Sequence, residues 1–398
     1  MAIVINGSGT VTGLAVGGLP DGTVDEGTLA TDSVTAAKIP ASLENTFVSG
    51  RKNMIINGAM NVAQRGTSTT GVGTTGFFAC DRVKLYAGGG SSSSRYTVTQ
   101  STDSPTGFNY SYKIDCTTAN ASPSAGHNTY LRLGIIEKQD LVNTKFGTSS
   151  AESLTLSFWV KSNITGSQQV LFANHVHQKQ AGGTFTISSA DTWEKKTITV
   201  SGDTVNSFDA TNPISLALSF DMFLEAGSTY YGGTAQGDTW GDRTNNTKAV
   251  NRLNISSSTS NYFNITGVQL ELGSTATDFE HRSYGEELAL CQRYYETTNT
   301  IGDWGYLIGS CYNSSQMYVD YAYKVRKRTT PTVTYLGGTV SSSWAVYAGG
   351  SARSVTAINF EPKNDFLTFY MTGSFVAGQA GMVTYTSGTK AIEFDAEL

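Results

Sequence analysis

The sequence predicts an all-β protein, and three observations support this prediction. Only 15% of the residues are charged, against roughly 25% in typical soluble domains. Aromatic residues make up 11% of the chain and there are 43 glycines, a combination that suits strands and turns better than helices. Short segments of alternating apolar and polar residues recur between Gly-, Ser- and Asn-rich turns. We therefore expect a jelly-roll β-sandwich, a smaller C-terminal β-sandwich, a short connecting helix and an irregular N-terminal attachment segment.

The N-terminal region, residues 1–50, differs from the rest of the chain. Its closely spaced glycines separate short apolar pieces such as those around Val11 and Leu14. A segment of this kind does not bury a core by itself. We expect it to be an attachment segment that partner chains stabilise, and symmetric closure makes a homotrimer the expected assembly. A disordered leader is the alternative.

Residues 51–284 carry the clearest strand pattern and are expected to form the jelly roll. Four alternating segments mark it best: Leu154–Val160, Thr197–Val200, Ile214–Phe220 and Tyr262–Leu272. Their spacing, with turn residues between them, is typical of a sandwich. A long connection rich in Gly, Thr, Asn and Asp runs from residue 226 to residue 250. Loops of that length are usually functional or mobile.

A short helix and a second group of strands are expected after the jelly roll. Ser283 and Glu286 have the spacing of a capping box, which begins a helical connector at residues 285–299. Residues 300–398 return to strands, and Gln316–Val325 alternates most clearly. This last region is expected to form the smaller β-sandwich, at the tip of the molecule.

Charge, hydropathy and cysteine usage argue against several function classes. The net charge is −5, and the chain lacks the clustered Lys and Arg of a nucleic-acid-binding surface. The one short basic run, residues 326–328, is interpreted as a solvated loop. No apolar stretch approaches the roughly 18 residues of a membrane span, and the N-terminus lacks signal-peptide features. The cysteines lack metal or redox spacing, and Cys116 and Cys291 are expected to be buried and reduced.

Patterns for catalysis or metal binding are weak. His175 and His177 would share a face if they lay on one strand, and three such pairs around a trimer axis could bind a metal, but solvent exposure is the simpler interpretation. Four carboxylates could act as a glycosidase acid and base: Glu225, Glu271, Asp278 and Glu280. Structural roles are expected for Glu271 and Glu280. No nucleophile motif or phosphate-binding loop is present. We expect no catalytic site, no cofactor and no bound metal.

Aromatic residues beside polar groups are the candidates for receptor binding, because Tyr and Trp give a large contact area with a polar edge. The long connection contains five candidates: Tyr230, Tyr231, Trp240, Asp238 and Asp242. Packing of this loop on the sandwich or on a neighbouring chain is the alternative. The C-terminal region contains five more: Trp304, Tyr306, Tyr312, Tyr318 and Trp344. Packing in the core is the alternative for these.

Several stretches resemble a known protein family. Asn53–Gly66, with Cys80–Arg82 after it, opens the jelly roll, and Ile265–Tyr295 closes it. Together with Val325–Thr334 they resemble the tail-fibre and minor structural proteins of tailed bacteriophages. The two ends of the jelly roll also resemble those of carbohydrate-binding jelly rolls, in which the first and last strands pair and so close the edge of the sandwich.

The resemblance implies a non-catalytic virion protein, a tail fibre that mediates adhesion to a glycan or protein on the host cell surface. The N-terminal segment would dock on a tail, baseplate or adaptor protein, and the C-terminal domain would present several weak sites per virion. The absence of an export signal fits synthesis in the host cytoplasm and release by lysis. The alternatives are a polysaccharide-degrading fibre, a capsid or tail decoration protein that binds no host, and a secreted bacterial carbohydrate-binding module.

Overall fold

The computed structural model divides the chain into two compact units, Met1–Arg51 and Lys52–Leu398. It describes residues 4–5, 11–12, 51–89, 93–208, 211–299, 307–335, 344–385 and 390–398. In the first unit, β1 (Val4–Ile5) pairs antiparallel with β2 (Val11–Thr12). The rest of the expected attachment segment, up to residue 50, lies outside the described residues.

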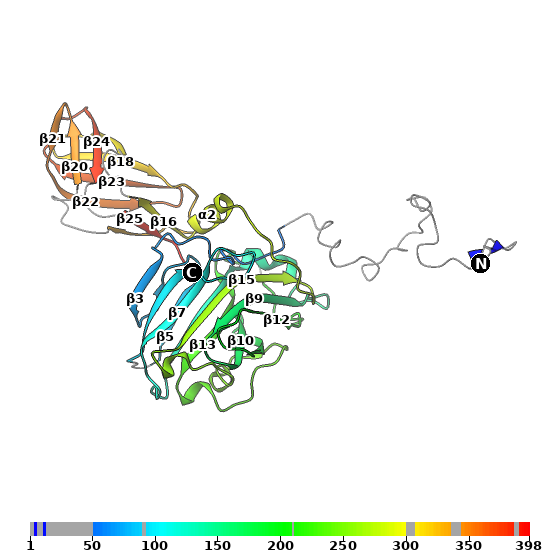
Figure 1. Ribbon diagram of the computed structural model, residues 1–398. Coiled ribbons are helices and arrows are strands. Elements are labelled where there is room, and N and C mark those ends of the chain that lie inside the picture. Colours follow the sequence, from blue (N-terminus) through cyan, green and yellow to red (C-terminus); the bar gives the residue numbers. More distant parts are fainter. Residues whose placement is uncertain are drawn as a thin grey trace. The chain divides into compact units, whose positions relative to one another are not determined.

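Two antiparallel sheets form the jelly roll of the second unit (Figure 1). The larger sheet consists, in order, of β14 (Gly241–Asp242), β11 (Lys179–Ile187), β10 (Gly166–Asn174), β13 (Leu216–Ala226), β8 (Asn128–Glu137), β5 (Lys84–Gly88) and β4 (Gly76–Phe77). The smaller sheet consists of β12 (Glu194–Val200), β9 (Leu154–Ser162), β15 (Tyr262–Leu272), β7 (Ser111–Thr118), β6 (Arg95–Ser101) and β3 (Ser68–Val72). Four 3-10 helices lie in the connections: η2 (Lys138–Thr144), η3 (Ser228–Tyr230), η4 (Asn245–Thr247) and η5 (Ile255–Ser257). The predicted all-β sandwich is confirmed.

The core of the jelly roll lies between the two sheets. Every second side chain of the long strands points into it. Leu156 and Phe158 of β9, and Phe220 and Met222 of β13, are fully buried there. The Phe220 ring meets the Phe172 ring of β10 edge to face, with 4.7 Å between centroids. Burying a side chain of this size stabilises the fold by about 1.5–3 kcal/mol relative to leaving it exposed.

The opening segment of the jelly roll lies beside the last jelly-roll strand, β15, but the expected edge closure by paired first and last strands is wrong. Residues 53–55 form no regular element, residues 56–59 form a turn, and β15 lies inside its sheet, between β9 and β7. The Met54 N–H donates to the Leu270 carbonyl at 3.0 Å, and the Val268 N–H donates to the Gly58 carbonyl at 2.9 Å. A Cβ at Gly58 would lie 2.1 Å from the Val268 carbonyl oxygen, so only glycine permits this approach.

The connecting helix, α2 (Tyr284–Gln292), begins where the capping box predicted. The Ser283 hydroxyl accepts a hydrogen bond from the Glu286 N–H at 3.3 Å. The helix is shorter than the connector expected at residues 285–299, because β16 (Tyr295–Asn299) follows it and pairs with β25 (Lys390–Asp395).

The C-terminal region contains two further sheets. The smaller consists of β16, β25 (Lys390–Asp395) and β19 (Thr332–Tyr335). The larger consists, in order, of β21 (Ser351–Arg353), β20 (Trp344–Ala348), β24 (Ala380–Tyr385), β17 (Leu307–Cys311), β18 (Gln316–Ala322), β23 (Phe366–Gly373) and β22 (Val355–Pro362). Met317 and Val319 of β18 and Phe369 of β23 are fully buried in a core that also includes Phe394 of the smaller sheet.

The interpretation of residues 326–328 as a solvated loop is wrong for two of the three. Lys327 is 1% exposed, and its ammonium group lies 2.5 Å from a Glu296 carboxylate oxygen. Arg328 donates to three backbone carbonyls, those of Ile214, Ala396 and Glu397, at 2.9–3.1 Å. Both side chains satisfy buried polar groups where the chain returns toward the jelly roll. Arg326 alone is exposed.

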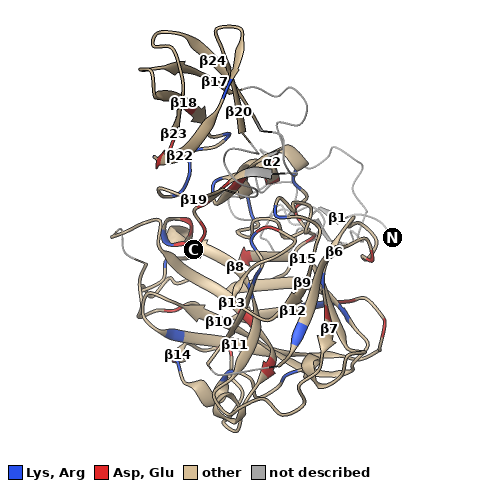
Figure 2. Cartoon of the chain, turned by 90° about the vertical axis from the view of Figure 1, so that its left-hand side faces the viewer, with Lys and Arg blue, Asp and Glu red and all other residues tan. Residues whose placement is uncertain are grey.

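Charged residues are sparse on the described strands, and Figure 2 shows mostly uncharged residues on the strands of both sandwiches. The four cysteines are free and buried, which confirms the prediction for Cys116 and Cys291. Among the described residues, no helix has the length and apolar character needed to cross a membrane.

Candidate functional site

The outer face of the larger jelly-roll sheet is partly buried, because the long connection at residues 226–250 covers it. We call this connection the covering loop. On β13, Phe220 and Met222 point into the core, so the alternation places Asp221 and Phe223 on the opposite face. Both are nonetheless almost fully buried, at 4% and 3% exposure. The backbone of Ala249 donates to the Tyr230 carbonyl at 2.9 Å, which closes the covering loop on itself.

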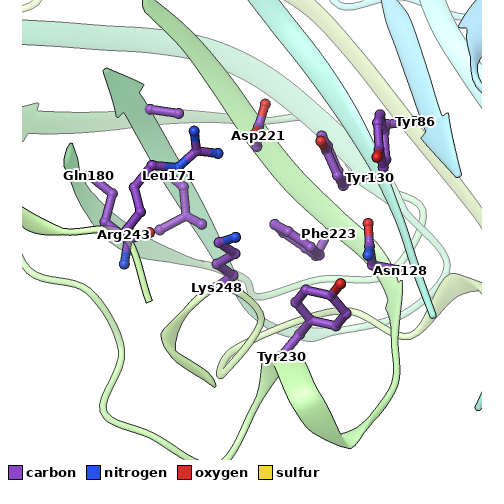
Figure 3. Close-up of a pocket in the computed structure, with 11 residues that line it drawn as sticks. Tyr86, Asn128, Tyr130, Leu171, Gln180, Asp221, Phe223, Tyr230, Arg243 and Lys248 are labelled. Atoms are coloured by element: carbon purple, nitrogen blue, oxygen red, sulfur yellow. The ribbon is translucent and has the colours of Figure 1, made fainter. Parts of the chain in front are cut away.

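A pocket of about 200 Å³ opens between this face and the covering loop (Figure 3). Strands supply most of its lining: Tyr86 from β5, Asn128 and Tyr130 from β8, Leu171 and Ala173 from β10, Gln180 from β11, and Asp221 and Phe223 from β13. The covering loop supplies Tyr230, Arg243 and Lys248. Pockets that combine apolar or aromatic side chains with a few placed polar groups are the usual form of small-molecule sites.

Four aromatic side chains form one side of the pocket. The rings of Tyr86 and Tyr130 stack with 4.7 Å between centroids. Phe223 meets Tyr130 at 4.8 Å and Tyr230 at 6.1 Å. Because these rings support one another, their faces and hydroxyl groups are held in place before any ligand arrives.

An ion pair between neighbouring strands fixes the polar part of the pocket. Arg132 of β8 lies opposite Asp221 of β13, and its Nε and Nη2 atoms donate to the two carboxylate oxygens at 2.8 Å each. Burial alone would raise the pKa of Asp221, but the charge and hydrogen bonds of Arg132 hold it below the usual 3.8. Asp221 is therefore ionised and engaged by Arg132.

Two cations of the covering loop face the aromatic side. Figure 3 shows Arg243 across the pocket from Tyr86 and Tyr130, and Lys248 nearer to Phe223 and Tyr230, with its ammonium 5.9 Å from the centre of the Tyr230 ring. An Arg243 Nη atom donates to the Gln178 side-chain oxygen at 3.3 Å, and the Lys248 ammonium donates to the Asn245 side-chain oxygen at 2.7 Å. Both partners are neutral.

The structure brings only one of the long-loop candidates into the pocket, namely Tyr230. Trp240 instead packs against Phe146 with 5.6 Å between centroids, and its indole N–H donates to the Ser201 carbonyl at 2.8 Å.

The other three candidates of the long connection also lie outside the pocket. The Arg252 guanidinium lies 4.1 Å from the centre of the Tyr231 ring. Asp242 is exposed and forms an ion pair with Lys179 at 2.6 Å. The Asp238 backbone carbonyl accepts from the Ser201 N–H at 3.0 Å. Parts of the loop therefore pack on the sandwich, as the alternative interpretation held.

The C-terminal candidates fall into three groups. Trp304 and Tyr306 lie outside the described residues. Trp344 is 3% exposed and packs in the core, where it presents no ring face to a ligand. Tyr312, at 71% exposure, meets Tyr318 edge to face at 5.7 Å, and Tyr318 lies 5.5 Å from Tyr370.

These tyrosines belong to an exposed sheet face. We use the name tyrosine face for the outer surface of the larger C-terminal sheet around six residues: Ile308, Tyr312, Tyr318, Tyr347, Tyr370 and Met382. The register places Ile308 opposite Met382, and Met382 opposite Tyr347, so their side chains form one row across three strands.

Sequence reasoning missed most of the pocket, including Tyr86, Tyr130, Asp221, Arg243 and Lys248. One signal was present: Asp221 interrupts the apolar β13 run, and Arg132 lies between Leu131 and Leu133 of β8. A charged residue within a strand of this kind marks a face that is polar or paired. No comparable signal singles out the loop residues.

The two histidines do not share a strand face, which corrects that expectation. β10 ends at Asn174, whose side-chain oxygen accepts from the N–H groups of Val176 and His177 at 3.0 and 3.1 Å and so begins a turn. The His175 ring nitrogen lies 2.9 Å from the Ser219 hydroxyl, and that of His177 lies 2.7 Å from the Ser207 carbonyl. In the described part of the chain, no group of three potential ligands could hold a metal ion.

The candidate acid–base carboxylates mostly hold the fold together. The Glu280 carboxylate accepts hydrogen bonds from the N–H groups of Lys52 and Asn53 at 3.1 and 2.6 Å. The Glu271 carboxylate accepts one from the Thr277 N–H at 3.1 Å. Glu225 is fully buried, and the Ser94 hydroxyl donates to it at 2.6 Å. The Asp278 backbone carbonyl accepts from the Gln269 side chain at 3.1 Å.

Comparisons with known proteins give distant structural similarities. No protein-family model matches the sequence, and no curated protein matches it. A putative sugar-binding protein from Bacteroides thetaiotaomicron is 14% identical, with a TM-score of 0.28, over 56% of this chain and 100% of that one. The xylan-binding CBM22-1 domain of Paenibacillus barcinonensis Xyn10C is 8% identical, with a TM-score of 0.24, over 57% of this chain and 100% of that one.

One similar structure comes from a bacteriophage. The enzymatically active domain of tailspike protein 4 of bacteriophage CBA120 is 13% identical over 55% of this chain, with a TM-score of 0.25. This chain spans 21% of that chain's length. At such identities and TM-scores, these similarities assign no function.

Proposed function

We propose that this protein is a non-catalytic, glycan-binding tail fibre of a bacteriophage, and that it binds a sugar of the host cell surface in the jelly-roll pocket. The observation that carries the proposal is the pocket itself, in which supported aromatic rings face charged and amide groups under a covering loop. Sugars present apolar ring faces and polar edges, and aromatic side chains with neighbouring hydrogen-bonding groups match both.

Adhesion without catalysis is supported by the pocket's carboxylate content. Glycoside hydrolysis commonly uses two carboxyl groups, roughly 5 to 10 Å apart, on either side of the scissile bond. Among the lining residues, all of which are described, Asp221 is the only carboxylate, and Arg132 engages both of its oxygens. The pocket is therefore better suited to holding a sugar than to cleaving one.

Binding and catalysis are separated by two measurements on the full chain. Titration calorimetry with host surface polysaccharide should show saturable binding that Tyr230→Ala weakens about tenfold, because aromatic contact is lost. Prolonged incubation with the same polysaccharide should release no new reducing ends. Binding that Tyr230→Ala leaves unchanged would exclude the pocket as the site. New reducing ends would establish the polysaccharide-degrading alternative.

The assembly and location of the fibre are part of the proposal. The protein would be a homotrimer that joins a tail, baseplate or adaptor protein through residues 1–50, and would reside in the virion. The separate compact unit Met1–Arg51 supports an attachment role distinct from the sandwiches. Light scattering on the purified full chain should give three times the mass of one chain, and a monomer at micromolar concentration would contradict the trimer. Immunogold labelling of intact virions tests the location.

A further inference from the structure

The charges that line the pocket do not cancel. Three cations, Arg132, Arg243 and Lys248, lie in or beside it, together with the single carboxylate of Asp221. Arg132 and Asp221 form a bidentate pair and neutralise each other. Arg243 and Lys248 remain without an ion-pair partner among the described residues.

The carboxylate nearest in sequence does not neutralise them. Asp242 precedes Arg243, but its side chain pairs with Lys179 at 2.6 Å on the exposed edge of the sheet. The polar partners of the two cations are amide oxygens, from Gln178 and Asn245. An amide oxygen satisfies a donor but supplies no full negative charge.

The two cations are also close enough to repel each other. Burial lowers the pKa of Lys248 and the charge of Arg243 lowers it further, while the charge of Asp221 offsets only part of this shift. His175, which lies beside the Arg132–Asp221 pair, adds no negative charge, because a histidine is neutral or positive. A bound anion would relieve this repulsion in a site where solvent screens charges only in part.

The pocket offers rings and cations to one ligand. Arg243 lies across the pocket from Tyr86 and Tyr130 (Figure 3), and the Lys248 ammonium lies 5.9 Å from the centre of the Tyr230 ring. The volume of about 200 Å³ lies below the roughly 300–1,000 Å³ of pockets that enclose drug-sized ligands. It therefore suits one sugar residue, whose ring meets the tyrosines while a substituent reaches the cations.

We propose that this pocket selects a sugar residue that carries a carboxylate, a uronic acid, with Arg243 and Lys248 as the counter-charges. The planar fork of an arginine side chain matches the two oxygens of a carboxylate, and a nearby lysine adds a second charge. This inference rests on the proposed function, since it names the class of sugar that the same pocket accepts.

The test compares acidic oligosaccharides with neutral derivatives of the same shape. The probes are tetramers of galacturonate, glucuronate-containing hyaluronan and alginate, each beside its methyl ester, together with sulfated galactan tetramers. Titration of the full chain should show that the preferred acid binds about tenfold or more tighter than its ester, because a charge-assisted hydrogen bond is lost on esterification. A rising salt concentration should weaken binding of the acid and leave binding of the ester unchanged.

Variants connect the preference to the two cations. Arg243→Gln and Lys248→Gln should each remove most of the difference in affinity between acid and ester. Arg326→Gln and Lys145→Gln are the matched controls, because both residues are exposed cations outside the pocket, and neither should change the preference.

Each remaining outcome overturns a defined part of the account. If the esters bind as tightly as the acids and Tyr230→Ala still weakens binding, the charge inference is wrong, but the pocket remains the glycan site. Binding of the sulfated probe alone would overturn the assignment to a carboxylate. Failure of every acid and ester to bind would overturn the inference and also count against glycan binding by the pocket.

Discussion

The outer faces of the two larger sheets, one in the jelly roll and one in the C-terminal sandwich, follow the same alternation but differ in character. In the jelly roll, the long connection after β13 covers the face and leaves a small pocket lined by aromatic rings and two cations. The tyrosine face has no such cover in the described residues, so Tyr312 and Ile308 are each 71% exposed. The covering loop, and not the strands, therefore makes one face a site with fixed geometry.

This difference separates two modes of adhesion. A pocket with supported side chains loses little conformational freedom on binding and can discriminate between ligands by charge. An open face of tyrosine, isoleucine and methionine suits broad contact, because exposed apolar patches usually mark interaction surfaces. The sequence favoured the C-terminal region as the recognition surface. The described structure gives the jelly roll the better-formed site, and the two remain testable against each other.

The largest expected effect separates core aromatics from surface aromatics within the C-terminal sandwich. Trp344→Ala should lower the free energy of unfolding by about 4 kcal/mol, since it empties a buried site. Tyr312→Ala, at an exposed site, should lower it by about 0.5 kcal/mol or less. Urea unfolding measures both. Equal losses would mean that Tyr312 is a structural residue and not part of an available surface.

The next effect concerns the charge pair beneath the pocket. Arg132→Met should lower the free energy of unfolding by about 3 kcal/mol at neutral pH, because it leaves the Asp221 carboxylate buried and unpaired. Loss of Arg132 also raises the pKa of Asp221, so the defect should shrink as the pH falls and the carboxyl is protonated. The double variant Arg132→Met/Asp221→Leu should recover most of the stability. A single variant as stable as the wild type would show that the pair is not needed to hold the pocket.

The pH dependence of stability should distinguish the two sandwiches. Burial, with the charge of Arg132, lowers the pKa of His175 from 6.5 to about 3. The unfolded chain therefore takes up a proton below pH 6.5 that the folded chain does not, and stability falls as the pH falls through this range. The contribution of His175 between pH 7 and pH 5 should be a loss of about 2 kcal/mol, which protonation of Asp81, whose pKa burial raises to about 6, opposes in part.

This pH effect is specific to the jelly roll, because all four histidines lie between residues 127 and 281. His175→Gln should flatten the profile of unfolding free energy against pH, whereas His177→Gln, at an exposed position, should not. An unchanged slope in the His175 variant would assign the acid sensitivity to other groups.

The smallest expected effect comes from the N-terminal unit. Deletion of residues 1–45 should shift the melting temperature by no more than about 1 °C, because the two sandwiches lie in the separate compact unit Lys52–Leu398. The same deletion should prevent incorporation into virions. Normal incorporation would contradict the attachment role, and a large loss of melting temperature would show that the segment stabilises the sandwiches.

The sequence predicted strands better than sites, for a physical reason. Alternation is a local property, so Tyr262–Leu272 matches β15 at both ends, and Ser283 marks the start of α2. The pocket depends instead on which strands become neighbours and on where the covering loop folds back. Asp221 and Arg132 are 89 positions apart and meet only through the pairing of β8 with β13. Lys327 shows the same limit, because its burial depends on Glu296, 31 positions away.

The central claim, that the jelly-roll pocket binds the host glycan, is tested most directly by blocking phage adsorption with the full-length protein. Wild-type protein should compete with the phage for its host, and the double variant Tyr230→Ala/Lys248→Gln should lose most of this competition at equal stability. The double variant Tyr312→Ala/Tyr370→Ala should retain it. The opposite result, with blocking lost only when the tyrosine face is altered, would contradict the account and place recognition in the C-terminal sandwich.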